Sequence, residues 1–247
     1  MTHILITGAA SGIGRASALK LAAAENARLV LIDRDATGLD TLLKELGSGD
    51  WQAAPMDVAD PEAWAALDLG GAPLTGAVLA AGISDAAPIV DMSFEDWRRV
   101  MSVNLDGAFL ALQFALRNAA EGASIVAVGS ATGRKAVPNT AAYGASKAAL
   151  SQLVKVGALE GAARQVRVNA VAPGGVKTPM FSNLDFFKEL TALHGSEDAA
   201  WSALAVETPL KRFAEAAEVA ALIAFLLGPD AISITGATLD CDGGYGV

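Results

Sequence analysis

The sequence has few of the residues that build disulfides and metal centres. Its 247 residues include one cysteine, Cys241, and two histidines, His3 and His194. A single cysteine forms no internal disulfide, and the chain has no cluster of cysteines and histidines at the spacing of zinc ligands. We therefore expect neither a disulfide framework nor a metal site.

Charged residues and long apolar runs are also scarce. Charged residues make up 18% of the chain and hydrophobic ones 53%, which excludes a disordered chain and supplies a large core. No apolar run reaches the roughly 20 residues that cross a bilayer, and the start, MTHILITG, lacks the basic leader of a signal peptide. A net charge of −9 argues against nucleic acid or anionic membrane as partners. These features predict a cytoplasmic globular protein that binds small molecules.

Short apolar runs alternate with helical patterns along the chain. Most runs are continuously apolar, which is typical of parallel strands covered on both faces. We expect strands at residues 3–7, 27–33, 51–57, 74–82, 124–130, 166–173 and 237–244, and helices at 13–25, 36–46, 60–67, 94–121, 140–161 and 214–227. This alternation predicts an α/β fold with a doubly wound parallel sheet. Since no repeat or linker divides the chain, we expect one domain over residues 1–247.

One segment departs from the alternation. Residues 176–212 join the sixth expected strand to the last helix and are too long for a simple connection. After Thr178 this insertion contains an apolar set: Met180, Phe181, Leu184, Phe186 and Phe187. The set could close over a bound ligand as a lid spanning about residues 178–212. Alternatively it packs a helical hairpin against its own domain, because apolar residues at helical spacing are normally core.

The segment ILITGAASGIGRA places three glycines between the first strand and the first helix. In a doubly wound sheet this turn faces the ligand crevice, and glycines let the backbone approach a pyrophosphate at the helix N-terminus. The spacing of Gly8, Gly12 and Gly14 differs from the general G-x-G-x-x-G fingerprint. The flanking strand and helix, with an acidic residue closing the second strand, nevertheless match a dinucleotide site. A glycine-rich helix cap without a ligand is the alternative.

The acidic residue is Asp33, which lies 19 residues after Gly14. At the end of the second strand its carboxylate would hydrogen-bond the adenosine ribose hydroxyls and repel a 2′-phosphate, which favours NAD over NADP. Arg15 and Arg34 weaken this preference, because either guanidinium could meet a phosphate. An ordinary aspartate at a strand end is the other interpretation.

Five short motifs follow one another along the chain: TGAASGIG, VNLDG, VAVGS, YGASK and VAPGGVKTP. In this order and spacing the chain resembles the short-chain dehydrogenase/reductase family, from Ile4 to the closing DGG. The resemblance implies a Rossmann-type seven-stranded parallel sheet, a nicotinamide cofactor and alcohol/carbonyl chemistry. It also implies catalytic roles for Asn104, Ser130, Tyr143 and Lys147.

The YGASK motif places Tyr143 and Lys147 one helical turn apart. Hydride transfer to a carbonyl requires the protein to move one proton at the oxygen, and a free tyrosine with a pKa of about 10 is a poor base at neutral pH. The Lys147 ammonium would favour the phenolate, and an oxidised nicotinamide would add a second positive charge. Ser130 would hydrogen-bond the substrate oxygen. The family resemblance implies that Asn104 holds a water linking the lysine to solvent.

Each of these residues also has a plainer interpretation. Tyr143 and Lys147 could form a solvated pair on a helix surface. Ser130 could be a turn residue, and Asn104 could bond within its own helical turn. The five motifs together favour the catalytic interpretation.

The resemblance further implies cofactor contacts from several turns. The residues expected to bind the cofactor are Gly8, Ser11, Gly12, Ile13, Gly14, Asp33, Asp57, Val58, Ala80, Ala81, Gly82, Tyr143, Lys147, Pro173, Gly174, Val176 and Thr178. The family commonly has N-N-A-G after the fourth strand, whereas this chain has Ala80, Ala81 and Gly82 after Leu79. Because two amide side chains are missing, we expect backbone or water to brace this turn.

These observations predict a NAD(H)-dependent oxidoreductase that interconverts a hydrophobic secondary alcohol and its ketone, with Tyr143 as general acid/base. An NADPH-dependent reductase of the 3-oxoacyl-(carrier protein) type shares the motifs but is disfavoured by Asp33 and the long insertion. A non-catalytic nucleotide-binding protein is a third alternative. The alanine-rich segments 94–121 and 140–161 allow close helix approach, and relatives pair these helices across a dimer axis. We expect a homotetramer, with a dimer as the alternative.

Overall fold

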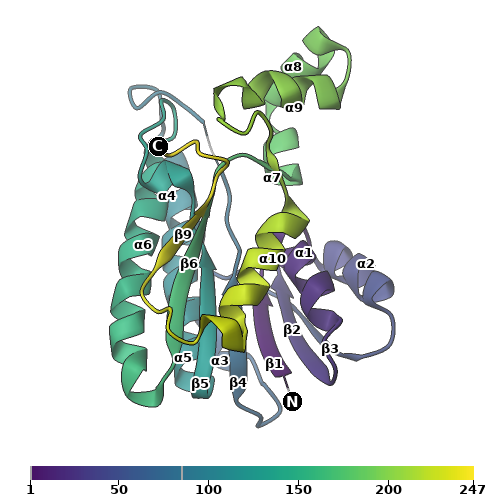
Figure 1. Ribbon diagram of the computed structural model, residues 1–247, viewed down its shortest axis with the longest axis vertical. Coiled ribbons are helices and arrows are strands. Elements are labelled where there is room, and N and C mark those ends of the chain that lie inside the picture. The colour runs from purple at the N-terminus through teal and green to yellow at the C-terminus, as the bar shows by residue number, and fades with distance from the viewer. Residues whose placement is uncertain (1, 85) are drawn as a thin grey trace.

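A parallel sheet forms the centre of the computed structural model (Figure 1), which describes residues 2–84 and 86–247. Met1 and Asp85, which the expected domain includes, lie outside the described residues. The strands pair in the order β3-β2-β1-β4-β5-β6-β9. They are β1 Thr2–Thr7, β2 Ala27–Asp33, β3 Asp50–Pro55, β4 Leu74–Leu79, β5 Ala119–Val128, β6 Arg167–Pro173 and β9 Thr238–Cys241. This order confirms the doubly wound prediction and puts a topological switch point between β1 and β4.

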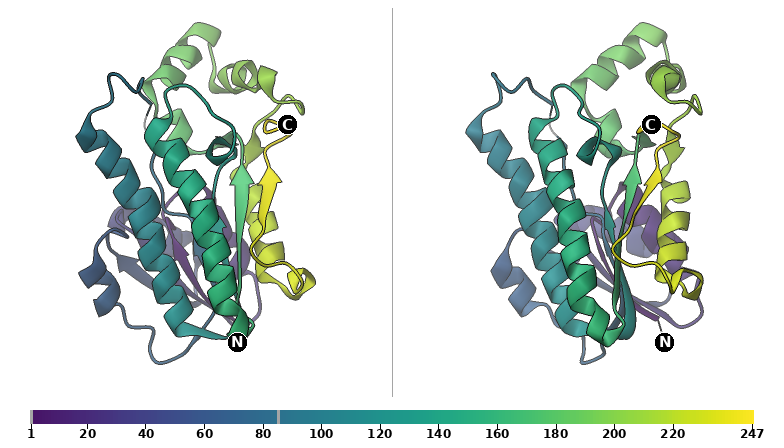
Figure 2. Two further views of the ribbon diagram at one scale, coloured as in Figure 1. Left: turned by 90° about the vertical axis from the view of Figure 1, so that its left-hand side faces the viewer. Right: turned by 60° about the vertical axis from the view of Figure 1, so that its left-hand side comes forward.

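Helices cover both faces of the sheet, as Figures 1 and 2 show. One face carries α1 (Gly12–Ala22), α2 (Ala36–Leu46) and α10 (Ala216–Leu227). The other carries α3 (Pro61–Ala66), α5 (Gly107–Asn118) and α6 (Ala141–Gly161), with α4 (Phe94–Met101) packed on α6. No helix among the described residues is both long and apolar enough to cross a membrane.

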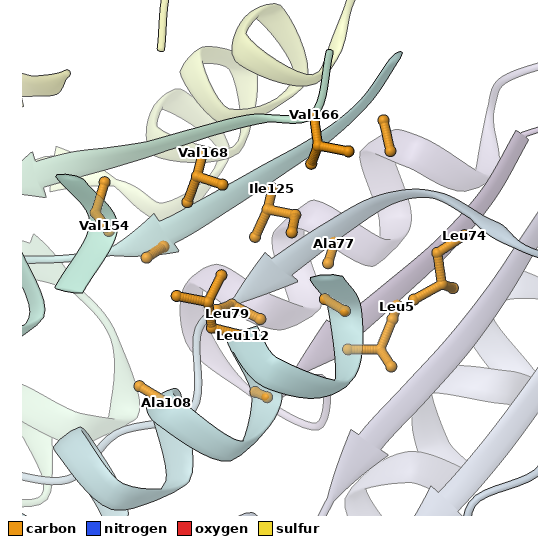
Figure 3. Close-up of a cluster of buried hydrophobic side chains, with 14 of the residues drawn as sticks. Leu5, Leu74, Ala77, Leu79, Ala108, Leu112, Ile125, Val154, Val166 and Val168 are labelled. Atoms are coloured by element: carbon orange, nitrogen blue, oxygen red, sulfur yellow. The ribbon is translucent and has the colours of Figure 1, made fainter. Parts of the chain in front are cut away.

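Alternate residues of each strand supply two hydrophobic cores. Leu5, Ala77 and Ile125 belong to the core under α5 and α6, which Figure 3 shows from close by. Ile4 and Val78, their neighbours along the strands, belong to the core under α1 and α10. Both sides of the central strands are therefore buried, which explains why their sequences are continuously apolar rather than alternating.

The boundary between the long helix and β5 differs from the prediction. The expected helix over 94–121 is interrupted by a π-helical segment, Ser102–Asp106, and ends at Asn118, so that β5 begins at Ala119. Arg164 accounts for part of this difference, because its guanidinium donates to the carbonyl oxygens of Leu116 and Ala119. These bonds satisfy carbonyls that a helix leaves without partners at its end.

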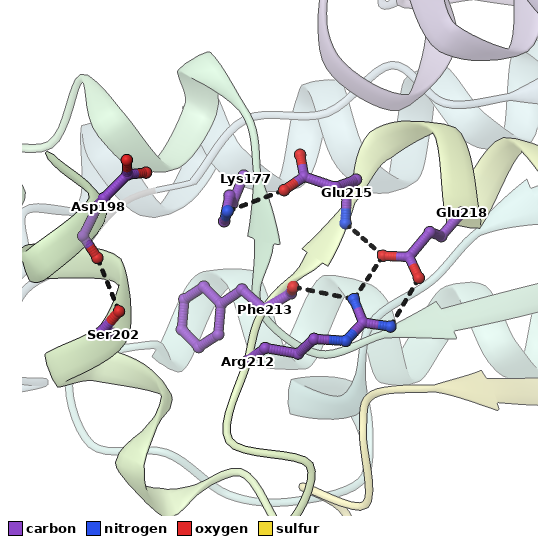
Figure 4. A network of polar contacts seen from close by, with 7 residues as sticks. All are labelled: Lys177, Asp198, Ser202, Arg212, Phe213, Glu215 and Glu218. Atoms are coloured by element: carbon purple, nitrogen blue, oxygen red, sulfur yellow. Dashed lines mark hydrogen bonds and ion pairs between the residues drawn. The ribbon is translucent and has the colours of Figure 1, made fainter.

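The insertion forms three helices on a narrow base. They are α7 (Pro179–Ser182), α8 (Asp185–His194) and α9 (Glu197–Leu204), flanked by the short strands β7 (Val176–Lys177) and β8 (Ala214–Glu215). β7 and β8 pair with each other in parallel, and the Lys177 ammonium lies 2.8 Å from a Glu215 carboxylate oxygen. As Figure 4 shows, Arg212 also binds both carboxylate oxygens of Glu218, at 2.6 and 2.7 Å. Both ends of the insertion are thus fastened together where it leaves the sheet.

The insertion has a small aromatic core of its own. Phe187 and Trp201 are buried with ring centroids 4.2 Å apart, and Phe181 packs against both. Met180 and Phe186, in contrast, are each 41% exposed. Phe181 and Phe187 therefore pack in the core of a helical hairpin, as the alternative interpretation predicts. Met180 and Phe186 leave part of their surface free to contact other molecules.

His3, in β1, generates a prediction about stability. It is 3% exposed, its Nε2 has no hydrogen-bond partner among the described residues, and burial together with the nearby Arg28 lowers its pKa from the ordinary 6.5. As the pH falls below 6.5, His3 therefore becomes protonated in the unfolded chain before it does so in the folded protein. The contribution of neutral His3 to the free energy of unfolding is therefore complete above pH 6.5 and is lost as the pH falls from 6.5 through the lower pKa of the folded protein.

We expect the free energy of unfolding to decrease less steeply between about pH 7 and pH 5 in His3→Asn than in the unaltered protein. Asparagine keeps a donor for the Pro73 carbonyl that His3 Nδ1 contacts at 3.2 Å. Urea denaturation at several pH values measures both slopes. Equal slopes would show that His3 does not titrate on unfolding.

Candidate active site

The turn between β1 and α1 is shaped by glycines. Gly8 has a φ of +69° and Gly12 a φ of +53°. A Cβ on Gly8 would lie 2.8 Å from the Ala81 amide nitrogen, and one on Gly14 would overlap the carbonyl oxygen of Gly8. The turn is therefore packed so closely against the exit of β4 that positions 8 and 14 have no room for a side chain.

The N-terminus of α1 opens onto this turn. Its N-cap, Ser11, makes no side-chain capping bond, and its first turn, from Gly12 through Ile13 and Gly14, contains no acidic residue. Backbone N–H groups and the helix dipole make such an end attractive to an anion. Together with the space left by the glycines, these residues fit the pyrophosphate of a dinucleotide.

Asp33 closes one side of the turn. Its Oδ2 accepts a hydrogen bond from the Ala10 amide and its Oδ1 accepts one from the Asp35 amide, both at 3.0 Å. Arg15 is ion-paired with Glu45 on α2, whereas the Arg34 side chain is exposed. Of the two arginines that weakened the NAD preference, one therefore already has a carboxylate partner.

Side chains brace the turn after β4. Thr7 Oγ1 accepts hydrogen bonds from the amides of Ala80 and Ala81, both at 3.1 Å. Asn104 Oδ1 accepts from the Ile83 amide at 2.8 Å, and its Nδ2 donates to the Ile83 carbonyl at 2.9 Å. The prediction that backbone or water would replace the missing amides is wrong, because side chains from β1 and from the long helix reach the same turn.

Asn104 is fully buried and lies in the π-helical segment. Single turns of π-helix are frequent at functional sites. Its side chain bonds to Ile83 and, through Nδ2 at 3.2 Å, to Ser146 Oγ, and not within its own helical turn. A Cβ on Gly82 would lie 3.3 Å from Asn104 Oδ1 and 3.5 Å from Lys147 Nζ. The exit of β4 therefore brings Gly82, Asn104 and Lys147 together.

Lys147, on α6, points into the molecule. It is 5% exposed, and its Nζ donates to the Val128 carbonyl at the end of β5, at 2.8 Å. Burial lowers its pKa to about 8, which leaves most of the side chain protonated at pH 7. A solvated surface pair with Tyr143 is therefore excluded.

Tyr143 lies on the same helix, with the Lys147 Nζ 5.7 Å from its ring centroid. Burial raises the pKa of Tyr143, and a hydrogen bond between its side chain and that of Ser130 opposes the rise. For the chain by itself, burial is the largest influence on Tyr143 and disfavours the charged form. That Lys147 and an oxidised nicotinamide together favour the phenolate stays a prediction. In the protein alone, Tyr143 is a proton donor.

Ser130 follows β5 by two residues and is 9% exposed. Its Oγ accepts a hydrogen bond from the Thr132 amide at 3.2 Å, as a turn residue would, and its side chain counteracts the rise in the pKa of Tyr143. Ser130 thus forms a turn, as the plainer interpretation expects, and its hydrogen bond to the substrate oxygen stays a prediction.

Sequence reasoning missed Ser146. This fully buried residue donates from Oγ to the Tyr143 carbonyl at 2.7 Å and accepts from Asn104 Nδ2. It therefore links the backbone of Tyr143 to the turn after β4. Its position three residues after Tyr143, inside YGASK, is the signal that could have identified it. Thr7 and the Val128 carbonyl were missed as well.

The remaining predicted cofactor residues lie along the same edge of the sheet. Thr178 reaches the glycine turn, since a Cβ on Gly12 would lie 3.4 Å from its Cγ2. Pro173, Gly174 and Val176 lie at and after the end of β6, close to that threonine in sequence. Asp57 and Val58 follow β3, two strands away from β1. Among residues 2–84 and 86–247, no cluster of three or more histidine, cysteine or acidic side chains could hold a metal ion.

A doubly wound parallel sheet with a glycine turn at its switch point and a serine, tyrosine and lysine at its carboxyl edge defines a nucleotide-dependent oxidoreductase fold. The chain belongs to the short-chain dehydrogenase/reductase family. A family model described as enoyl-(acyl carrier protein) reductase matches residues 8–246.

Curated relatives match nearly the whole chain. Galactitol 2-dehydrogenase (L-tagatose-forming) of Cereibacter sphaeroides is 39% identical, over 98% of this chain and 94% of its own length. Cis-4-hydroxycyclohexanecarboxylate dehydrogenase of Sinomonas cyclohexanicum is 36% identical, over 98% of this chain and 95% of its own length. The chain is therefore similar to dehydrogenases named for galactitol and for cis-4-hydroxycyclohexanecarboxylate.

Solved structures agree with the fold and differ in cofactor. A 3-oxoacyl-[acyl-carrier protein] reductase of Brucella melitensis with bound NAD is 31% identical with a TM-score of 0.84, covering 100% of this chain and 91% of that one. The actinorhodin polyketide ketoreductase with NADPH is 30% identical with a TM-score of 0.89, covering 99% and 97%. Nicotinamide cofactors of both kinds thus occur on this architecture.

Replacing Gly14 with alanine should weaken NAD binding by at least about tenfold, because the new Cβ overlaps the Gly8 carbonyl and pushes the turn away from the helix N-terminus. Gly195→Asn is the control, since position 195 ends α8 in a left-handed conformation with open space around it. Calorimetric titration with NAD measures both affinities. An equal loss of NAD affinity in the two variants, or no loss in Gly14→Ala, would contradict the role of the glycine turn in binding the pyrophosphate.

Proposed function

We propose that the protein is a NAD(H)-dependent oxidoreductase that interconverts a hydrophobic secondary alcohol and its ketone, with Tyr143 as general acid/base. The observation that carries the proposal is the cluster at the carboxyl edge of the sheet. There the Ser130 side chain counteracts the rise in the pKa of Tyr143, and the buried ammonium of Lys147 lies 5.7 Å from the centroid of the Tyr143 ring, with Asn104 close by. The glycine turn at the same edge fits a dinucleotide.

The proposed roles follow from the protonation states. When bound, a nicotinamide accepts or supplies the hydride. During reduction of a ketone, the Tyr143 hydroxyl gives its proton to the substrate oxygen, and Ser130 hydrogen-bonds that oxygen as negative charge develops. The positive charge of the Lys147 ammonium then stabilises the phenolate that remains on Tyr143. During oxidation the same proton moves from the alcohol to the phenolate.

NAD is proposed over NADP on the basis of Asp33. Two backbone amides hold its carboxylate at the end of β2, where a 2′-phosphate would be repelled. Arg15, which could otherwise attract that phosphate, is paired with Glu45. The alternative, an NADPH-dependent 3-oxoacyl-type reductase, requires the exposed Arg34 to outweigh Asp33.

Asp33→Asn should reduce the ratio of kcat/KM for NAD over NADP by at least about tenfold, because the repulsion of the 2′-phosphate is removed. Asp40→Asn, which removes an exposed carboxylate from α2, is the matched control and should leave the ratio unchanged. Initial rates with both cofactors give the ratio. A protein that already prefers NADP would contradict the assignment.

A hydrophobic alcohol is proposed because the insertion presents Met180 and Phe186, each 41% exposed, beyond its aromatic core. We propose that the insertion acts as the lid of a single catalytic domain and that these side chains cover the substrate. Homotetramer formation is supported by apolar residues exposed on α5 and α6, namely Phe109, Val156 and Leu159. The cytoplasmic location stays a prediction.

The two tyrosines provide a matched test of the mechanism. Tyr143→Phe should lower turnover by at least about a hundredfold while NAD binding changes little, because only the proton donor is removed. Tyr245→Phe, at the only other tyrosine of the chain, should keep its turnover. Rates with aliphatic, cyclic and aryl ketones and with polar sugars measure the effect. Retained turnover in Tyr143→Phe would refute the mechanism, and reaction with sugars alone would refute the hydrophobic substrate.

A further inference from the structure

The C-terminal residues 242–247 contact two segments that border the candidate site. We propose that this C-terminal tail sets substrate selectivity by joining the loop after Ser130 to the end of the insertion. The proposal rests on the proposed function. Figures 1 and 2 show the C-terminus at the same edge of the sheet as the insertion.

On one side the tail contacts the loop that follows Ser130. The Lys135 Nζ donates to the Tyr245 carbonyl at 2.6 Å and lies 4.0 Å from the centroid of the Tyr245 ring, in a cation–π arrangement. Arg134, the preceding residue, is ion-paired with Asp240 in β9. Two successive cations of one loop are therefore held by the C-terminal segment.

A short turn connects these cations to the serine. The Lys135 amide donates to the Ala131 carbonyl at 2.9 Å, and the Thr132 amide donates to Ser130 Oγ at 3.2 Å. Gly133 lies so close to α6 that a Cβ there would be 2.9 Å from the Lys147 carbonyl carbon. A shift of Lys135 would therefore be transmitted to the residues that bind the substrate oxygen.

On the other side the tail lies on the end of the insertion. The Leu210 amide donates to the Gly243 carbonyl at 3.1 Å. A Cβ on Gly243 would be 2.8 Å from Thr208 Cγ2, and one on Gly244 would be 3.0 Å from Pro209 Cγ. Both glycines have positive φ values, +64° and +86°, so the backbone itself packs where no side chain fits.

The tail holds a defined shape between these contacts. Asp242 Oδ1 accepts from the Gly244 amide at 2.9 Å, and Oδ2 accepts from the Gly246 amide at 2.8 Å. One carboxylate therefore folds the tail and directs Tyr245 toward Lys135. Such local bonds from an aspartate to following amides stabilise turns.

The consequence concerns the two walls of the substrate site. In the proposed function the substrate lies between the loop with Ser130 and the insertion with Met180 and Phe186. Because the tail is bonded to both, it limits their separation and hence the size of substrate that fits. Pocket size discriminates between substrates modestly, by about 10- to 200-fold for a single methylene. Loosening the tail should therefore relax the selectivity between small and bulky ketones and leave cofactor binding in place.

The test compares kcat/KM for cyclohexanone and for the bulkier bicyclic ketone 2-decalone. Three variants loosen the tail: Tyr245→Ala, Lys135→Met and deletion of residues 245–247. Two controls should not: Tyr245→Phe keeps the ring and the carbonyl, and Lys155→Met removes an exposed lysine elsewhere on α6. We expect the ratio of 2-decalone to cyclohexanone to rise at least about fivefold in the loosened variants only, with NAD affinity changed by less than about twofold.

Failure of this proposal differs from failure of the proposed function. An unchanged ratio in active loosened variants would overturn the role of the tail in selectivity. If the unaltered protein reduces no ketone, the proposed function fails, and hydrogen exchange then tests the tail itself. Amides of residues 131–135 should exchange faster after deletion of residues 245–247. Unchanged exchange there would show that the tail does not hold the loop.

Discussion

The buried ammonium of Lys147 is the constraint on which the candidate site depends. A charge removed from water requires compensating polar partners, and here the Val128 carbonyl at the end of β5 supplies one. Gly82 keeps space for the ammonium, since a Cβ there would lie 3.5 Å from Nζ, and Gly133 lets the loop after Ser130 pack on the backbone of the lysine. The end of β5, the exit of β4 and the start of α6 are thereby fixed relative to one another.

Burial acts on both titratable groups of the site. It lowers the pKa of Lys147 and raises that of Tyr143, so in each case it disfavours the charged form. The hydrogen bonds that run from Ile83 through Asn104 and Ser146 to the Tyr143 carbonyl hold the tyrosine backbone independently of any charge. Position and protonation are thus controlled by different residues, and mutating one set need not alter the other.

The sheet, the glycine turn and the placement of Tyr143 and Lys147 on one helix are predicted well from the sequence, because each is encoded in neighbouring residues. Continuous apolar runs predict parallel strands, and Gly8 and Gly14, between an expected strand and an expected helix, predict the turn that joins them. The end of α5 was misplaced because alanines fit both helix and strand, and Arg164, which satisfies the helix-end carbonyls, is remote in sequence. The bracing by Thr7 escaped prediction for the same reason, since it joins residues more than 70 positions apart.

The fastened base of the insertion has an architectural consequence. The strand pair β7–β8 and the ion pairs Lys177–Glu215 and Arg212–Glu218 hold the start and the end of the insertion together, which closes it at its base. The aromatic packing of Phe181, Phe187 and Trp201 lies beyond that closure, and Phe213, next to β8, joins it from the base. The helices between β7 and β8 therefore form a small unit with its own aromatic core, which contacts the rest of the chain at this base, through Thr178 and through Leu210. The length and sequence of α8 and α9 can therefore diverge with little effect on the sheet, so that this part of the chain can change while the glycine turn and the helix with Tyr143 and Lys147 stay constant.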